Sequence, residues 1–368
     1  MKRVLFLTIY ASPYRVRFFD ELAKDAEVTV LFCQQRKDTA HRDAKWFEKG
    51  QGRFHGVQLK KTLGSGRKTL CLSVCKWLKR EYDAIIVCGY SSPTMILAML
   101  WMRLKGIPFT MEIDGGLVRA ENRLKYAFKR FLVRLPNRWL STGKVPTRFL
   151  VHYGADPAQI TEYPFSSLSE QDILSAPVEP EEKQTLRADL KIPEKHMVLS
   201  IGQFIHRKGF DVLLKAAQSL DADTGIYIVG GEATEEYLTM RRELGLEDRV
   251  HFLGFKPREE LANFYRAADT FVLPTREDIW GLVINEALAY GLSVVTTDRC
   301  VAGVELVENG VNGYIVPVGD GKALADALTR VLSGDAAAMG RASLEKIRGY
   351  TIENMAKAHV AFLQETGA

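Results

Sequence analysis

Two acidic residues with seven residues between them, Asp278 and Glu286, flank the start of an expected helix. Residues 270–273 form a short apolar run typical of a buried strand, and residues 282–290 have apolar positions at helical spacing. In an open α/β sheet, ligands bind beyond the carboxyl ends of the strands. A helix that begins at that edge offers free N–H groups to an anion. A diphosphate is therefore the natural ligand of this segment.

The two acids suit other parts of such a ligand. Glu286, about one turn inside the helix, could accept hydrogen bonds from ribose hydroxyls, and Asp278 in the loop could reach a sugar. Taken alone, each acid is more simply a loop residue or a complement to the helix dipole. Their occurrence on either side of Trp280-Gly281 favours a binding site, in which the helix start contributes Gly281, Leu282 and Val283.

A basic turn, Arg207-Lys208-Gly209, lies just beyond the expected strand 197–201. Two adjacent cations there could neutralise a phosphate group, although an exposed basic turn is the simpler alternative. The segment matches neither the P-loop pattern nor the G-x-G-x-x-G pattern of dehydrogenases. Two more turns follow expected strands and would let the backbone approach a ligand closely; they contain Gly231, Glu232 and Phe255.

Strand and helix patterns alternate in both halves of the chain, which is typical of doubly wound parallel sheets. We expect strands at 4–9, 28–32, 84–88, 109–113, 197–201, 226–229, 250–253, 270–273 and 293–296. A stretch rich in serine, proline and glutamate separates the halves and places the domain boundary near residue 168. The expected fold class is therefore α/β, with two Rossmann-like domains, 1–168 and 169–349, that face a central cleft.

Charge is divided unevenly between the halves. Residues 1–150 hold 29 Lys and Arg against 12 Asp and Glu, whereas the remainder holds 21 against 33. Within the first half, residues 119–139 combine basic residues with apolar ones at helical spacing. Such a helix could lie on an anionic membrane surface, or its apolar stripe could pack on its own sheet. Nucleic acid is a poorer partner, because the acidic second half would repel it.

Several patterns bear on compartment and metal binding. The five scattered cysteines form no C-x-x-C pair and indicate reduced thiols. Residues 4–10 resemble a buried strand more than a signal peptide, and glycine and proline interrupt the uncharged stretch 84–102, which favours a strand followed by a helix. The histidines provide no paired metal ligands, and Asp221-Ala222-Asp223 is expected to be a solvated turn. We therefore expect a cytoplasmic protein that needs no metal.

The acid spacing, together with the surrounding Trp-Gly-Leu-Val-x-x-Glu-Ala, resembles the E-x₇-E motif of family 4 glycosyltransferases, which have the GT-B fold. The resemblance is strongest across residues 197–317. It implies that Asp278, which replaces the family's first glutamate, contacts the donor sugar and that Glu286 binds the ribose. Lys208 matches the family lysine that neutralises the donor diphosphate, and Arg207 could compensate for the family arginine that is Gln203 here. The turns with Gly231, Glu232 and Phe255 resemble family positions around the donor nucleotide.

The resemblance further implies a retaining, metal-independent transferase that acts in bacterial cell-envelope polysaccharide or glycolipid assembly. It would move a hexose or N-acetylhexosamine from a nucleotide sugar, with a UDP-sugar expected first, to a saccharide or lipid-linked saccharide. The N-terminal domain would bind this acceptor, with Tyr14, Arg15 and Asp114 as candidate residues, and a final helix within 350–368 would pack back on it. We expect peripheral attachment at the inner face of the cytoplasmic membrane. A sugar-nucleotide epimerase of the same fold and a catalytically silent donor-binding protein remain alternatives.

Overall fold

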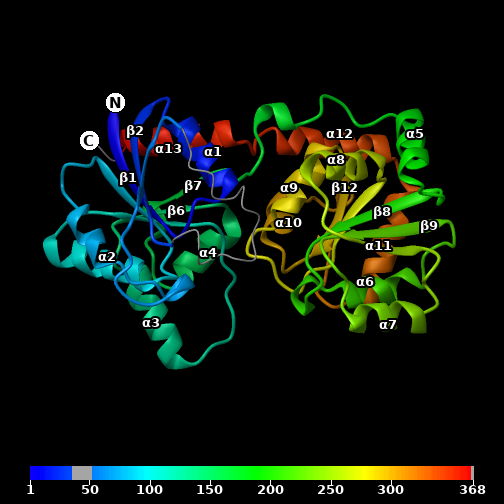
Figure 1. Cartoon of the computed structure of the whole chain (residues 1–368), viewed down its shortest axis with the longest axis horizontal. Coiled ribbons are helices and arrows are strands. Elements are labelled where there is room, and N and C mark those ends of the chain that lie inside the picture. Colours follow the sequence, from blue (N-terminus) through cyan, green and yellow to red (C-terminus); the bar gives the residue numbers. More distant parts are fainter. Residues whose placement is uncertain (35–51, 366–368) are drawn as a thin grey trace. The chain divides into compact units, whose positions relative to one another are not determined.

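The structure is a computed structural model that describes residues 1–34 and 52–365. It divides into two compact units, each an open sheet flanked by helices (Figure 1). Unit 1 combines Met1–Ser169 with Tyr350–Ala368, and unit 2 is Glu170–Gly349. Sequence patterns placed the boundary near residue 168, and the units divide after Ser169.

In the described part of unit 1, seven parallel strands form one sheet in the order β3-β2-β1-β4-β5-β6-β7. The strand order reverses between the neighbours β1 and β4, which makes their carboxyl ends the switch point of this sheet. The strands are β1 (Lys2–Thr8), β2 (Ala26–Phe32), β3 (His55–Gln58), β4 (Ala84–Cys88), β5 (Thr110–Ile113), β6 (Arg138–Ser141) and β7 (Ile160–Glu162). The helices are α1 (Pro13–Leu22), α2 (Pro93–Lys105), α3 (Arg123–Val133), α4 (Lys144–His152) and α13 (Ile352–Glu365).

The uncharged stretch 84–102 forms a strand and a helix, as the glycine and proline within it predict. Ser92 caps α2 by accepting a hydrogen bond from the Met95 N–H, Pro93 occupies the first turn, and Gly106 ends the helix with φ of 62°. Among the described residues, no helix is both long and apolar enough to cross a membrane.

The basic segment 119–139 is only partly helical, which corrects the expectation of one long helix. Helix α3 begins at Arg123, where the Asn122 side chain caps it, and ends at Val133. Pro136 and Asn137 then interrupt the helical pattern, and Trp139 is buried in β6. The short strands β3, β6 and β7 were not expected, because none of them contains the continuous apolar run that is typical of a central strand.

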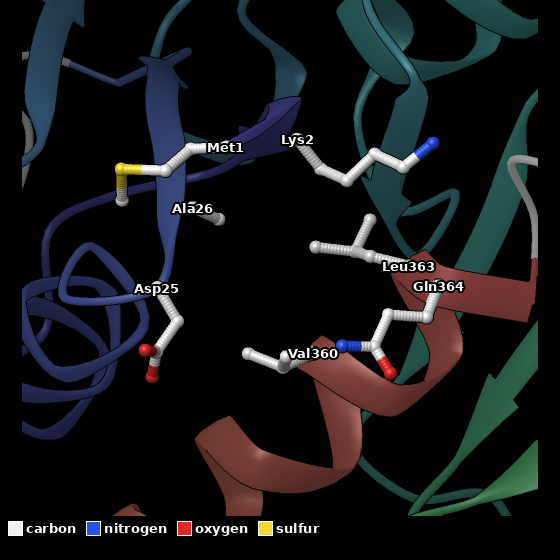
Figure 2. Close-up of a pocket in the computed structure, with 7 residues that line it drawn as sticks. All are labelled: Met1, Lys2, Asp25, Ala26, Val360, Leu363 and Gln364. Atoms are coloured by element: carbon white, nitrogen blue, oxygen red, sulfur yellow. The ribbon is translucent and has the colours of Figure 1, made fainter.

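The final helix, α13, belongs to unit 1 and packs against α1. The Ile352 N–H at its start donates to the Leu168 carbonyl at 2.7 Å. Beside α13, a cavity of about 370 Å³ opens at the amino ends of β1 and β2 (Figure 2). Val360 and Leu363 of α13 line it together with Ala26 of β2. Ligands of such sheets bind at the switch point, at the carboxyl ends of the strands, and this cavity lies at the opposite ends.

Unit 2 contains six parallel strands in the order β10-β9-β8-β11-β12-β13, with its switch point between β8 and β11. The strands are β8 (His196–Ile201), β9 (Thr224–Val229), β10 (Val250–Leu253), β11 (Thr270–Leu273), β12 (Ser293–Thr297) and β13 (Gly313–Val316). The helices are α5 (Pro180–Leu190), α6 (Phe210–Ala217), α7 (Glu235–Glu243), α8 (Arg258–Ala267), α9 (Leu282–Ala289), α10 (Val301–Leu306), α11 (Gly321–Ser333) and α12 (Ala336–Ile347).

Candidate functional site

The loops that follow β8 and β11 meet at the switch point of unit 2. The Lys208 ammonium lies 2.7 Å from a carboxylate oxygen of Asp278, and the Arg207 guanidinium lies 3.6 Å from the other oxygen. The side chains of Lys208 and Asp278 are only 12% and 15% exposed. Arg207, by contrast, is half exposed. The structure thus joins the two expected phosphate cations to the expected sugar-binding acid.

Glycines allow these loops to approach each other. Gly209 has φ of +71°, and a Cβ on it would lie 2.0 Å from the Pro274 carbonyl oxygen. Likewise, a Cβ on Gly230, just after β9, would lie 2.0 Å from the carbonyl oxygen of Gly202, just after β8. Any larger residue at Gly209 or Gly230 would therefore force the loops apart.

A second ion pair holds the same two loops together. Arg276 donates two hydrogen bonds to the Asp211 carboxylate, at 2.7 and 2.6 Å, and its backbone N–H donates to the Arg207 carbonyl at 2.8 Å. Hydrogen bonding from Arg276 holds the pKa of Asp211 below its ordinary value. Because this pair is bidentate, it fixes the loop geometry around Lys208. Sequence reasoning missed both residues, since nothing in their local spacing links them.

Helix α9 begins immediately after the Asp278 loop. Its N-cap residue, Gly281, has φ of +101°, and a Cβ there would lie 2.9 Å from the Cys300 sulfur. Burial raises the pKa of Cys300 to about 12, so it remains a neutral thiol. Since Gly281 has no side chain to cap the helix, the first N–H groups, those of Leu282 and Val283, stand at the switch point with the positive end of the helix dipole.

Glu286 is the fifth residue of α9, beyond its first turn. The Tyr265 hydroxyl on α8 donates to its carboxylate at 2.8 Å, and the Tyr265 ring stacks on Tyr290 with centroids 4.9 Å apart. Burial raises the pKa of Glu286 above its ordinary value. A half-buried acid with one hydroxyl donor retains capacity to accept further hydrogen bonds. Tyr265 was not found from the sequence, because it lies on a different helix.

The remaining donor-side candidates lie at the ends of β9 and β10. Gly231 has φ of +125° and no heavy atom within 4 Å of a built Cβ, so the chain there is open. Glu232 is exposed. The Phe255 side chain is 74% exposed, which is unusual for a phenylalanine. These residues follow β9 and β10, so they lie at the same carboxyl edge of the unit 2 sheet as Lys208.

In unit 1, Arg15 in the first turn of α1 meets Asp114, which directly follows β5. The Arg15 guanidinium donates to both Glu112 carboxylate oxygens, at 3.1 and 2.9 Å, and also pairs with Asp114. Arg15 is buried, with 3% of its side chain exposed, whereas 39% of the Asp114 side chain is exposed. Arg15 therefore positions Asp114 and is itself closed to a ligand. Burial and the charge of Glu112 raise the pKa of Asp114 to about 6, against the opposing effect of Arg15.

Glu112 is the centre of a buried polar cluster that the sequence did not reveal. It accepts hydrogen bonds from Tyr163 at 2.7 Å and Cys88 at 3.1 Å, and His359 of α13 lies 3.3 Å away. Burial alone would raise the pKa of Glu112, but Arg15 and His359 outweigh burial and hold it well below its ordinary range. The other His359 nitrogen lies 2.8 Å from the Met355 carbonyl. Both ring nitrogens of His359 thus face oxygen atoms, and the ring ties α13 to the end of β5.

Tyr14 is half-buried in the first turn of α1, next to Arg15. Its ring packs edge-on against Phe165 with centroids 5.7 Å apart, and burial together with Asp114 raises its pKa above the ordinary value. Tyr14 therefore remains a neutral hydroxyl. Within residues 1–34 and 52–365, no group of three or more His, Cys, Asp or Glu residues could hold a metal ion.

The two switch points and the strand orders define an α/β protein with two Rossmann-like domains. Residues 182–347, which lie wholly in unit 2, match the family model described as glycosyl transferases group 1. The match thus covers the loops around Lys208 and Asp278 and the whole of α9.

Curated relatives are similar over a comparable part of the chain. The amylovoran biosynthesis glycosyltransferase AmsK of Erwinia amylovora is 34% identical over 43% of this chain and 41% of its own length. The D-inositol 3-phosphate glycosyltransferase of Mycolicibacterium smegmatis is 32% identical over 54% of this chain and 48% of its own length. The chain therefore matches about half the length of these relatives.

Solved structures match over nearly the entire chain. Anabaena HepE, solved in complex with UDP, has a TM-score of 0.77 and 18% identity, covering 99% of this chain and 100% of that one. WaaG, a glycosyltransferase involved in lipopolysaccharide biosynthesis, has a TM-score of 0.64 and 16% identity, covering 98% and 99%. These likenesses establish the fold of this chain, which is the GT-B fold of glycosyltransferases, as predicted.

Proposed function

We propose that this chain is a glycosyltransferase that moves a sugar from a nucleotide-sugar donor, a UDP-sugar in the first instance. The observation that carries the proposal is the junction of Lys208 with the start of α9 at the unit 2 switch point. Two sources of positive charge meet there, where a ligand of this fold binds. The family match over the same residues and the UDP bound to HepE support a nucleotide-sugar donor.

In the proposed mechanism, Lys208, Arg207 and the N–H groups of Leu282 and Val283 bind the donor diphosphate. The bond between the anomeric carbon and the diphosphate oxygen breaks, and its electron pair leaves with the diphosphate. These groups stabilise that charge in place of a divalent cation. The acceptor oxygen bonds to the anomeric carbon on the face that the diphosphate leaves, so configuration is retained, and the acceptor proton passes to the departing phosphate.

Other residues bind the rest of the substrates. We assign the ribose hydroxyls to Glu286, held by Tyr265, and the face of the base to the exposed Phe255 ring and the neighbouring turn of Gly231 and Glu232. When the diphosphate binds Lys208, Asp278 must leave its ion pair with Lys208 and instead accept a hydrogen bond from a hydroxyl of the donor sugar.

On unit 1, Asp114 and Tyr14 would bind the acceptor, and Arg15 would hold Asp114 in place. The acceptor is a saccharide or a lipid-linked saccharide of cell-envelope polysaccharide assembly, and the donor sugar is a hexose or an N-acetylhexosamine. The amylovoran relative and the lipopolysaccharide enzyme support this assignment. The basic first domain would attach the enzyme to the inner face of the cytoplasmic membrane.

A panel of UDP-, GDP- and ADP-sugars tests the proposal. One nucleotide sugar should raise the melting temperature, and release of its nucleotide should require membrane extract and persist in EDTA. Stabilisation by none of the panel would contradict a donor site. Conversion of the sugar nucleotide without any acceptor would favour an epimerase, and binding without turnover would favour a silent donor-binding protein. The anomeric configuration of the product, read by NMR, tests retention.

A further inference from the structure

Helix α3 presents a row of large apolar side chains to solvent. Leu124 is 84% exposed, Phe128 is 53% exposed and Phe131 is 52% exposed. Their spacing of four and then three residues places them on one face of the helix. Leu132 and Val133, which point elsewhere, are fully buried in the core of unit 1. The helix therefore packs on the sheet with one side and leaves a second apolar ridge, Leu124, Phe128 and Phe131, uncovered.

Basic residues accompany this ridge. Arg123, Arg130 and Arg134 recur at intervals of seven and four residues, so they form a parallel row next to the ridge, and all three are exposed. Lys125 is exposed on the other side of the ridge. The helix itself contains no acidic residue. The nearest acid, Glu121, is turned to Lys129 at 2.6 Å and to the Tyr153 hydroxyl.

The neighbouring helix repeats the pattern on a smaller scale. Because β4, β5 and β6 are consecutive neighbours, the two connecting helices, α2 and α3, cover the same face of the sheet (Figure 1). On α2, Leu104 is 78% exposed and Leu100 is 40% exposed, one turn apart. Arg103 and Lys105 flank Leu104. Apolar tips among cations thus occur on both helices of this face.

We propose that α3 is a membrane-docking helix whose ridge, Leu124, Phe128 and Phe131, enters an anionic bilayer while Arg123, Arg130 and Arg134 bind lipid phosphates. Exposed aromatic and leucine side chains beside arginines match the boundary between acyl chains and headgroups. The charge favours this occupant over a second copy of the chain, since two such faces would place like charges together. The inference rests on the proposed membrane attachment and assigns it to one helix.

Sedimentation with vesicles tests the proposal on the full chain. The wild type should bind vesicles of phosphatidylcholine with about 30% phosphatidylglycerol and should bind pure phosphatidylcholine far more weakly. Combined Leu124→Ser, Phe128→Ser and Phe131→Ser should weaken binding to the anionic vesicles by about tenfold or more. Combined Arg123→Gln, Arg130→Gln and Arg134→Gln should remove the preference for anionic lipid. Added salt should weaken wild-type binding.

Matched controls lie on unit 2, where Val311→Ser changes an exposed apolar residue and Lys215→Gln changes an exposed cation. These variants should bind vesicles as the wild type does. All substituted side chains of the ridge are exposed, so an unchanged melting temperature will show that the variants fold. A separate experiment measures how deeply the helix enters the bilayer. Brominated lipids should quench the fluorescence of a tryptophan introduced by Phe128→Trp but not that of one introduced by Val311→Trp.

Three results would overturn the proposal: no binding of the wild type to anionic vesicles, unchanged binding of the ridge variant, or no bromolipid quenching at position 128. Conversion of a dimer to a monomer by the ridge variant, with vesicle binding intact, would instead assign the ridge to a second copy. The thermal shift with nucleotide sugars should be the same for the ridge variant and the wild type. If no nucleotide sugar raised the melting temperature of either the wild type or the ridge variant, this would therefore count against the transferase proposal and not against membrane docking.

Discussion

The ammonium of Lys208 and the carboxylate of Asp278 form a nearly buried ion pair of 2.7 Å, although they lie on loops that follow different strands. In the proposed enzyme these two residues bind different parts of the donor, the diphosphate and the sugar. The pair therefore holds Lys208 in place before the donor arrives, with the Asp278 carboxylate where the donor diphosphate would bind. When the donor binds, its diphosphate replaces Asp278 as the negative partner of Lys208.

Replacing Lys208 by glutamine should remove the main cation from the diphosphate site. We expect kcat/KM for transfer to fall by about 100-fold or more, because charge that develops on the leaving group loses a preorganised partner. Steady-state kinetics with the nucleotide sugar found by thermal shift will measure this. Lys215→Gln, on the exposed side of α6, is the matched control and should keep full activity. Equal activity of the two variants would rule out the assigned role of Lys208.

Replacing Asp278 by asparagine should separate binding from turnover. Without its carboxylate partner, Lys208 is free for the diphosphate, and UDP should bind more tightly, by about fivefold for each ~1 kcal/mol that the pair contributes. Transfer should nevertheless slow, because the donor sugar loses its acidic contact. Calorimetric titration with UDP and kcat measure the two effects. Glu277→Gln, at the adjacent acid, should change neither. Weaker UDP binding by the Asp278 variant would contradict the proposal that Asp278 and the diphosphate compete for Lys208.

Local patterns were sufficient for the α/β fold class and for the site loops of unit 2, but not for β6 or for the edge strands β3, β7 and β13. The apolar runs of β1, β4, β8, β11 and β12 are continuous because both faces of these strands are buried, and this made them readable. Lys208 and Asp278 were both selected from motifs within one loop each. Their direct contact was not predicted, since it depends on the order of strands in the sheet.

Other features depend on contacts between distant segments. His359 and Glu112 are far apart in the sequence, and neither stands in a recognisable motif. The sequence could not show whether the apolar stripe of α3 is exposed or buried. Helical periodicity shows which side chains share a face, but it does not show which face packs on the sheet. Arg15 was expected at the acceptor and is instead buried beneath Asp114.

Replacing Gly209 by alanine should be far more damaging than the same change at Gly245. Both glycines have a positive φ, +71° and +65°, but only the Gly209 Cβ would meet another atom, the Pro274 carbonyl oxygen, while the Gly245 Cβ would enter open space. Backbone conformation alone costs about 1–2 kcal/mol for an L-residue, and the clash adds to it. We expect Gly209→Ala to lower the free energy of unfolding by ~3 kcal/mol and to weaken UDP binding, as measured by denaturation and calorimetry. Similar losses for both variants would show that the β8 and β11 loops are not in this close contact.

Replacing Asp114 by asparagine should change how stability depends on pH. The pKa of Asp114 is raised to about 6 in the folded protein, so the folded state binds the proton more tightly than the unfolded chain. For the wild type, this residue therefore favours the folded state fully below its unfolded pKa, and that contribution is lost as pH rises through about 6. Asparagine resembles the neutral acid at every pH. The stability of Asp114→Asn relative to the wild type should thus increase between pH 4 and pH 7, over the window set by a pKa of about 6. Urea denaturation across this range will measure the difference, with Asp326→Asn on the surface of α11 as the control. A constant difference between the Asp114 variant and the wild type would mean that this carboxyl group does not titrate near pH 6.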